Sequence, residues 1–146
     1  MLRIFLDANV YFAGFNSEKG ASSLILEIIA RGKTQLYTSK LVLREVERNL
    51  RLKSKPENLK AFHRYLQKNK IHAVPFPEDK FLESFEALIH PKDLPVLGAA
   101  ILSKADYLIS LDRRHFLTNS LQSKLKKPVF ITPGDFLREV YLKGKL

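Results

Sequence analysis

Short apolar segments alternate with amphipathic segments along the chain, and this alternation constrains the fold more than any other feature of the sequence. Five segments have the length and composition of short strands: residues 2–6, 34–38, 71–74, 107–110 and 128–131. Helical spacing, caps or initial prolines mark further segments: residues 21–31, 40–53, 56–68, 78–88, 93–104 and 134–142. Strands separated by helices need crossover connections and therefore lie parallel. The sequence predicts an α/β fold, a three-layer α/β/α sandwich with a parallel sheet of about five strands.

The length and the absence of cysteine limit the class of protein. A chain of 146 residues predicts a single domain, residues 1–146, that needs no disulfide or zinc ion to fold. Without cysteine there is no disulfide framework, iron–sulfur cluster, thiolate zinc site or cysteine nucleophile. The longest apolar run, Leu24–Ala30, is interrupted by Glu27 and is far shorter than the roughly 18 residues of a membrane span. The N-terminal segment predicts a strand and not a secretory signal, so we expect a cytoplasmic protein with no membrane partner.

The basic charge of the chain is concentrated in one stretch. The formal net charge is +10, and residues 31–70 hold twelve basic and three acidic residues, a net charge of +9. A localised positive surface attracts polyanions, so nucleic acid is the first partner to consider. The same composition also suits a solvated lysine-rich surface, and charge alone favours neither interpretation. If the stretch binds RNA, the helix predicted over residues 40–53 offers five side chains for it: Lys40, Arg44, Arg48, Arg51 and Lys53.

Several common catalytic motifs are absent from the sequence. None of the six glycines has the spacing of a Walker loop or a dinucleotide-binding loop, and no serine lies in a nucleophile elbow. The four histidines lack the short spacing of zinc ligands, and we expect each to be a surface or loop residue: His63, His72, His90 and His115. The remaining candidates for chemistry are the carboxylates.

Two aspartates follow predicted strands. Asp7 ends the first apolar segment, where a charge is costly unless something neutralises it, and Asn9 would lie on the same side of an extended turn. Asp112 lies just after the strand at residues 107–110, two residues beyond the hydroxyl of Ser110. Ligands of parallel α/β sheets collect beyond the carboxyl ends of the strands, which favours both aspartates as site residues. Taken alone, either one also suits an ordinary cap or turn.

Two further positions have structural explanations of their own. Asp93 precedes an apolar helix, where Asp is a common N-cap. Glu45 and Glu47 lie on a predicted helix, among arginines that would pair with them at the surface. Three or four carboxylates at one end of a sheet would repel one another unless a cation lay among them, and such hard oxygen ligands select Mg²⁺ or Mn²⁺. A cluster of this kind suits metal-assisted hydrolysis of phosphodiesters.

Four segments of the chain, in order, resemble the motifs of the PIN-domain family. They are Ile4–Val10, Ser39–Leu50, Lys92–Ala100 and Ala105–Phe116. In the second, the pattern Glu-x-x-Arg-x-Leu begins at Glu45 and not at Glu47. In the fourth, Ser110 stands where many members have threonine. The resemblance covers essentially the whole chain.

This resemblance implies endonucleolytic cleavage of single-stranded RNA at an acidic pocket for Mg²⁺ or Mn²⁺. It gives the catalytic and metal-binding roles to four acids: Asp7, Glu45, Asp93 and Asp112. Asn9 and Ser110 match supporting positions that often carry a small polar side chain. Many members are toxins of bacterial or archaeal toxin–antitoxin pairs, often dimeric and silenced by a partner, and others act in RNA processing or quality control. The resemblance therefore implies an antitoxin partner and a homodimer.

Two alternatives keep the same fold. A non-catalytic module would bind RNA or a protein partner without cutting, although a lapsed site has no reason to retain four acids. The other alternative is a metal-dependent nuclease that acts on DNA or flap structures. The chain is short for such an enzyme, and it lacks a helical clamp or an added DNA-binding motif.

Overall fold

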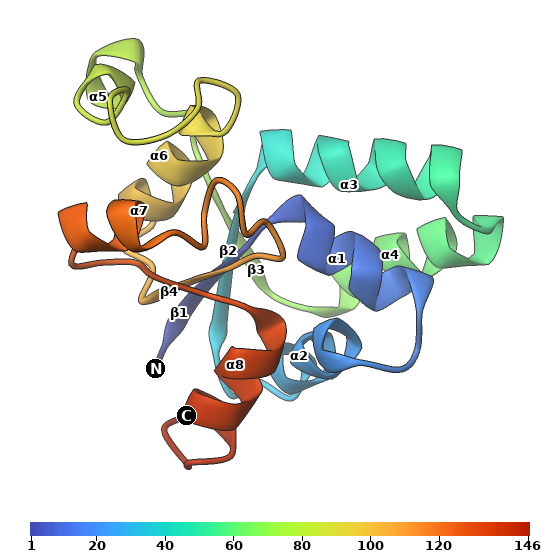
Figure 1. Ribbon diagram of the computed structural model, residues 1–146. Helices are drawn as coiled ribbons and strands as arrows, with labels where there is room; N and C mark the ends of the chain where they lie inside the picture. Colours follow the sequence, from blue (N-terminus) through green and yellow to red (C-terminus); the bar gives the residue numbers. More distant parts are fainter.

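Five parallel strands form one sheet in the order β3-β2-β1-β4-β5 (Figure 1). The computed structural model describes residues 1–146, and its strands are β1 (Arg3–Leu6), β2 (Gln35–Ser39), β3 (Ile71–Val74), β4 (Tyr107–Ile109) and β5 (Val129–Ile131). Phe5 of the central strand β1 lies in register with Tyr37 of β2 and Leu108 of β4. The predicted α/β fold with five parallel strands is confirmed.

Helices cover both faces of this sheet. The helices are α1 (Ala8–Asn16), α2 (Ala21–Ala30), α3 (Lys40–Lys53), α4 (Pro56–Lys68), α5 (Asp79–Glu83), α6 (Leu94–Leu102), α7 (Asn119–Lys124) and α8 (Pro133–Phe136), which continues as the π-helical turn η1 (Leu137–Tyr141). The chain crosses the sheet in one direction from β1 to β3 and in the opposite direction from β3 to β5. Because crossovers between parallel strands are right-handed, the helices of the first set of connections lie on one face of the sheet and those of the second set lie on the other. Accordingly, α1 and α6 lie on opposite sides of the sheet (Figure 1).

Helices with clear start signals have their predicted bounds. Helix α3 begins after Ser39, whose hydroxyl accepts a hydrogen bond from the backbone N–H of Val42. Helix α4 begins at Pro56, whose fixed φ angle suits the first helical position. Both are local signals, and both predictions are confirmed.

Other helical predictions need correction. The sequence does not predict α1, because its apolar residues surround the helix instead of forming one stripe, and Asp7 therefore precedes a helix and not an extended turn. A Cβ on Gly14 would lie 2.4 Å from Leu26 Cδ1, so this glycine lets α1 approach α2 closely. Helix α5 ends at Glu83 and not at residue 88, α7 is not predicted, and the last helix becomes π-helical from Leu137.

The order of the strands places a switch point beside β1. The chain passes from β1 to β2 on one side, whereas β4 pairs with β1 on the other side. The crevice beyond the carboxyl ends of two such strands is where open α/β sheets bind ligands. Ile4, Phe5 and Leu6 of β1 are fully buried, so the strand holds whatever follows it in a fixed position. None of the helices is long and apolar enough to cross a membrane.

Candidate active site

A cavity lies beyond the carboxyl ends of β1 and β4, at the switch point. Its volume is about 690 Å³, and acids from separate parts of the chain line it: Asp7, Glu45, Asp93 and Asp112. Asp7 follows β1, Glu45 lies on α3, Asp93 is at the start of α6 and Asp112 follows β4. The structure therefore brings together all four acids that the sequence suggests.

Asp7 is the most deeply buried of these acids, with 8% of its surface exposed. Its side chain accepts a hydrogen bond from the backbone N–H of Ala8 at 2.8 Å, so it caps α1 while it also lines the cavity. Burial raises the pKa of Asp7 to about 6, despite hydrogen bonds that lower it, and the charges of Glu45 and Asp93 add to the increase. The fold thus holds a carboxylate where its ionisation is costly, and a cation in the cavity would offset that cost.

Ser110 connects two of the acids. Its hydroxyl donates to Asp7 Oδ2 at 2.7 Å and accepts from the backbone N–H of Asp112 at 3.0 Å. Asn9 donates from Nδ2 to the same Asp7 oxygen at 3.2 Å, and its Oδ1 accepts from the backbone N–H of Leu111 at 3.1 Å. These bonds tie the start of α1 to the loop after β4 and fix the orientation of the Asp7 carboxylate.

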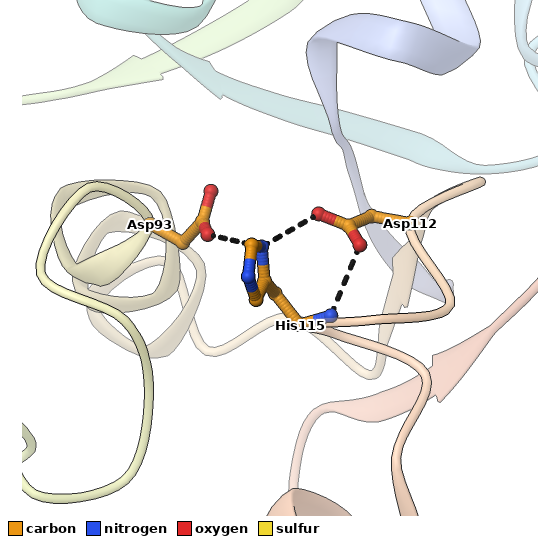
Figure 2. Close-up of side chains that lie close together, drawn as sticks. All are labelled: Asp93, Asp112 and His115. Atoms are coloured by element: carbon orange, nitrogen blue, oxygen red, sulfur yellow. Dashed lines mark hydrogen bonds and ion pairs between the residues drawn. The ribbon is translucent and has the colours of Figure 1, made fainter.

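A histidine that we expected to be a surface or loop residue lies between two of the acids (Figure 2). His115 Nδ1 is 2.9 Å from Asp93 Oδ2 and 3.2 Å from Asp112 Oδ2. The contact with Asp112 is a hydrogen bond, whereas the contact with Asp93 lacks hydrogen-bond geometry and leaves the buried Oδ2 without a hydrogen-bond partner. The only sequence signal for His115 is its spacing of three residues from Asp112.

Asp93 occupies the N-cap position of α6 but does not cap the helix. Its side chain accepts no hydrogen bond from the first turn of α6, and only 18% of that side chain is exposed. The side chain of Asp93 therefore does not serve as an N-cap, which was the structural explanation that the sequence offered for this residue. The carboxylate lies in the cavity instead.

The two neighbouring glutamates of α3 have different surroundings. Glu45 lines the cavity and lies close enough to Asp7 to raise its pKa. Glu47 is not among the lining residues and pairs instead with Arg51 at 3.3 Å and with His63 of α4 at 3.0 Å. Residues two apart on a helix point about 200° from each other, so only one of the two can face the cavity.

Basic side chains share the cavity with the acids: Arg44, Arg48, Lys53 and Lys92. The first three are among the residues predicted to bind RNA, and Lys92 is an addition that the sequence did not suggest. Lys40 and Arg51, the other two predicted RNA-binding residues, are not part of the lining. The cavity therefore combines carboxylates that suit a metal cation with cations that suit phosphate.

The donor set fits a divalent cation. Carboxylate oxygens are the ligands that Mg²⁺ and Mn²⁺ prefer, and the buried Oδ2 of Asp93 has no hydrogen-bond partner, although His115 Nδ1 lies 2.9 Å from it. Asp93, Asp112 and His115 offer ligand atoms that lie within 4.8 Å of one another. Burial is the main cause of the raised pKa of Asp7, and the charges of Glu45 and Asp93 add to it, so a cation in the cavity would favour the ionised carboxylate.

The fold and this cavity together define an α/β protein with an acidic, metal-type site at the carboxyl ends of its strands. The chain belongs to the PIN domain family, whose sequence profile matches residues 3–114, a range that contains all four acids. Members of this family are typically nucleases.

Two solved structures share this fold. One is VapBC2 from Rickettsia felis bound to a DNA fragment from their promoter, with a TM-score of 0.60 and 18% identity over 89% of this chain and 97% of that chain. The other is FitAcB from Neisseria gonorrhoeae, with a TM-score of 0.60 and 14% identity over 90% of this chain and 98% of that chain. At such identities the likeness establishes the fold alone. A sequence search of curated proteins found no match.

Proposed function

We propose that the chain is an endoribonuclease that hydrolyses phosphodiester bonds of single-stranded RNA with Mg²⁺ or Mn²⁺ as its cofactor. The observation that carries this proposal is the convergence of four acids, from separate elements, on one cavity that also holds four basic side chains. Acids gathered in this way repel one another unless a cation lies among them, and the basic side chains suit a polyanionic substrate. Membership of the PIN domain family supports a nuclease activity.

The residues that would hold the metal are the cavity acids Asp7, Glu45, Asp93 and Asp112. When bound, a divalent cation supplies Lewis-acid polarisation of the phosphodiester and makes hydrolysis feasible near neutral pH. Ser110 keeps the Asp7 carboxylate in one orientation through its 2.7 Å hydrogen bond, and it also receives the backbone N–H of Asp112. A carboxylate fixed before the substrate arrives needs no reorganisation during the reaction.

The basic side chains of α3 would hold the RNA backbone beside the acids. Arg44 and Arg48 are one helical turn apart, and Lys53 lies about 14 Å along the helix from Arg44 at a rise of about 1.5 Å per residue. Contacts to phosphate position a strand without reading its bases. We therefore expect this part of the binding to be independent of RNA sequence.

The test is a cleavage assay on an unstructured RNA and on a DNA strand of the same sequence, with Mg²⁺, with Mn²⁺ and with EDTA. We expect RNA to be cut with a metal and left intact with EDTA. Asp112→Asn should lose the activity, whereas Glu47→Gln, a carboxylate outside the cavity, should keep it. RNA that is bound but uncut with every metal would establish the non-catalytic alternative, and cleavage confined to the DNA strand would establish a DNA nuclease.

The proposal extends to a toxin that acts in the cytoplasm, forms a homodimer and is silenced by an antitoxin. The frequency of toxins in the family and the shared fold with VapBC2 and FitAcB favour this role. Expression of the chain alone should stop growth, the Asp112→Asn variant should not, and a small protein encoded beside it should restore growth. Light scattering after size-exclusion chromatography measures the oligomer. Normal growth with an active nuclease would refute the toxin role and leave the nuclease.

A further inference from the structure

His115 lines the cavity and contacts two of the four acids, although it is not an acid itself (Figure 2). It lies in the turn after β4, three residues beyond Asp112, and its backbone N–H donates to Asp112 Oδ1 at 3.0 Å. Side chain and backbone of His115 therefore hold the same carboxylate from two directions. On its other side the imidazole contacts Asp93, which comes from the start of α6.

The distances from His115 Nδ1 to the two carboxylate oxygens match those between adjacent ligands of one metal ion. Adjacent ligands of an octahedral ion with bonds of about 2.1 Å are about 3.0 Å apart. His115 Nδ1 is 2.9 Å from Asp93 Oδ2 and 3.2 Å from Asp112 Oδ2. The first of these contacts is within ion-pair distance but lacks hydrogen-bond geometry.

A second histidine holds the His115 ring in place. His90 stacks on it with ring centroids 5.3 Å apart and an angle of 29° between the planes. His90 is itself anchored, because its Nδ1 accepts a hydrogen bond from the backbone N–H of Lys92 at 3.1 Å. The imidazole of His115 thus packs against His90, and 33% of the His115 side chain is exposed.

We propose that His115 Nδ1 is a metal ligand beside Asp93 and Asp112, and that this nitrogen makes the site select Mn²⁺ over Mg²⁺. The inference rests on the proposed function, because it concerns the metal of that same site. Mg²⁺ takes oxygen ligands almost without exception, whereas imidazole nitrogen suits transition metals. A site with one nitrogen among its carboxylates favours Mn²⁺ more than a site of carboxylates alone.

The alternative is that His115 only positions the acids by hydrogen bonding, without touching the metal. The two roles differ in what glutamine can replace. In His115→Gln the side-chain amide still offers an N–H to Asp112, but its ligand atom is an oxygen. A positioning role would then be kept in large part, whereas a nitrogen ligand would be lost.

The direct readout is the hyperfine coupling between Mn²⁺ and ligand nitrogen, measured by pulsed electron paramagnetic resonance on the full chain labelled with ¹⁵N-histidine. We expect a ¹⁵N coupling of directly bound imidazole in the wild-type protein and in His63→Gln, whose side chain pairs with Glu47 outside the cavity. The coupling should be absent in His115→Gln. A melting curve in EDTA checks that each variant is folded.

The second readout is metal affinity by titration calorimetry. His115→Gln should weaken Mn²⁺ binding by at least about tenfold, the lower end of what even indirect partners of a metal contribute. Mg²⁺ binding should change much less, so the preference for Mn²⁺ should shrink. Equal losses for both metals would indicate a positioning role and overturn the proposal.

The failures of the two proposals can be told apart. Mn²⁺ that binds and supports RNA cleavage, but shows no ¹⁵N coupling in the wild-type protein, overturns the ligand role of His115 and leaves the nuclease in place. A wild-type protein that binds neither metal and cuts no RNA overturns both.

Discussion

Asp7→Asn should make the metal-free protein more stable at pH 8, although it removes a residue of the candidate site. Burial raises the pKa of Asp7 to about 6 from an ordinary value of 3.8, and the carboxylates of Glu45 and Asp93 contribute. The folded protein therefore holds the proton more tightly than the unfolded chain. The destabilisation is fully present above pH 6 and disappears as the pH falls to about 4, below which both states are protonated.

The size of the effect follows from that shift. A shift of roughly two pKa units corresponds to about 3 kcal/mol of unfavourable free energy at pH 8, at about 1.4 kcal/mol per unit. Asparagine keeps the cap on Ala8, because its Oδ1 can accept the same hydrogen bond. Its amide group takes the place of Oδ2, which accepted hydrogen bonds from Ser110 and Asn9. The Ser110 hydroxyl can rotate and accept a hydrogen bond from the amide, whereas the hydrogen bond from Asn9 Nδ2 is lost at a cost of about 1–1.5 kcal/mol. The net gain at pH 8 is about 1.5–2 kcal/mol, which raises Tm by about 3–8 °C.

The assay is thermal unfolding followed by circular dichroism, in EDTA, from pH 4 to pH 8. The two curves of Tm against pH should cross, because at pH 4 only the lost hydrogen bond remains and Asp7→Asn melts below the wild type. Excess Mn²⁺ at pH 8 should stabilise the wild type and have little effect on the variant. A variant that melts no higher than the wild type in EDTA at pH 8 would refute the reasoning.

Asp106→Asn is the matched control with the opposite sign. Burial raises the pKa of Asp106, but hydrogen bonds from the backbone N–H of Arg3 at 2.8 Å and from Lys127 Nζ at 2.9 Å outweigh it, and the net shift is downward. The folded state therefore favours the ionised form, and its stabilisation is present above the ordinary pKa and lost as the pH falls further. This variant should melt below the wild type at pH 8. The pair of variants separates the charge of the cavity from a general effect of replacing Asp with Asn.

Two further substitutions test the surroundings of α3. Glu45→Gln should lower the rate of RNA cleavage by at least about 100-fold, because it removes a proposed metal ligand. Glu47→Gln should change the rate little, because a surface ion pair is worth under about 1 kcal/mol. The reverse result would move the site by two residues. Replacing Arg44 and Arg48 together with Ala should flatten the slope of log RNA affinity against log salt by about 1.4, at about 0.7 per phosphate contact. Arg51→Ala, whose arginine pairs with Glu47, should leave that slope unchanged, and an unchanged slope in the double variant would place the RNA elsewhere.

Local signals were enough to predict the parts of the fold whose limits depend on a few neighbouring residues. The Ser39 cap and the proline at residue 56 mark the starts of α3 and α4, and the strand at residues 71–74 has the bounds that its sequence predicts. The positions of Asp7 and Asp112 also follow from local sequence, because each comes just after a short apolar strand. In a parallel sheet the carboxyl ends of the strands share one edge, which is why two residues so far apart in sequence could be assigned to one site.

Local sequence signals did not predict helix α1. Its apolar side chains contact neighbours on several sides. Gly14 is unfavourable in an isolated helix, but a Cβ there would lie 2.4 Å from Leu26 Cδ1 and 3.2 Å from the backbone oxygen of Ser22, both in α2. The reason for that glycine lies in another helix, twelve residues further along the chain. No pattern within the segment itself contains this information.

The composition of the cavity was decided by packing. Val46 lies on the buried face of α3, with Glu45 on one flank and Glu47 on the other. Helix α4 packs on the Glu47 side, where His63 meets that glutamate, and Glu45 is left to face the acids. Local sequence favoured Asp7 and Asp112 as site residues, whereas Glu45 and Asp93 were assigned to the site through the resemblance to the PIN-domain motifs. The placement of His115 between Asp93 and Asp112 required α6 and the turn after β4 to meet, and only the tertiary structure brings those two segments together.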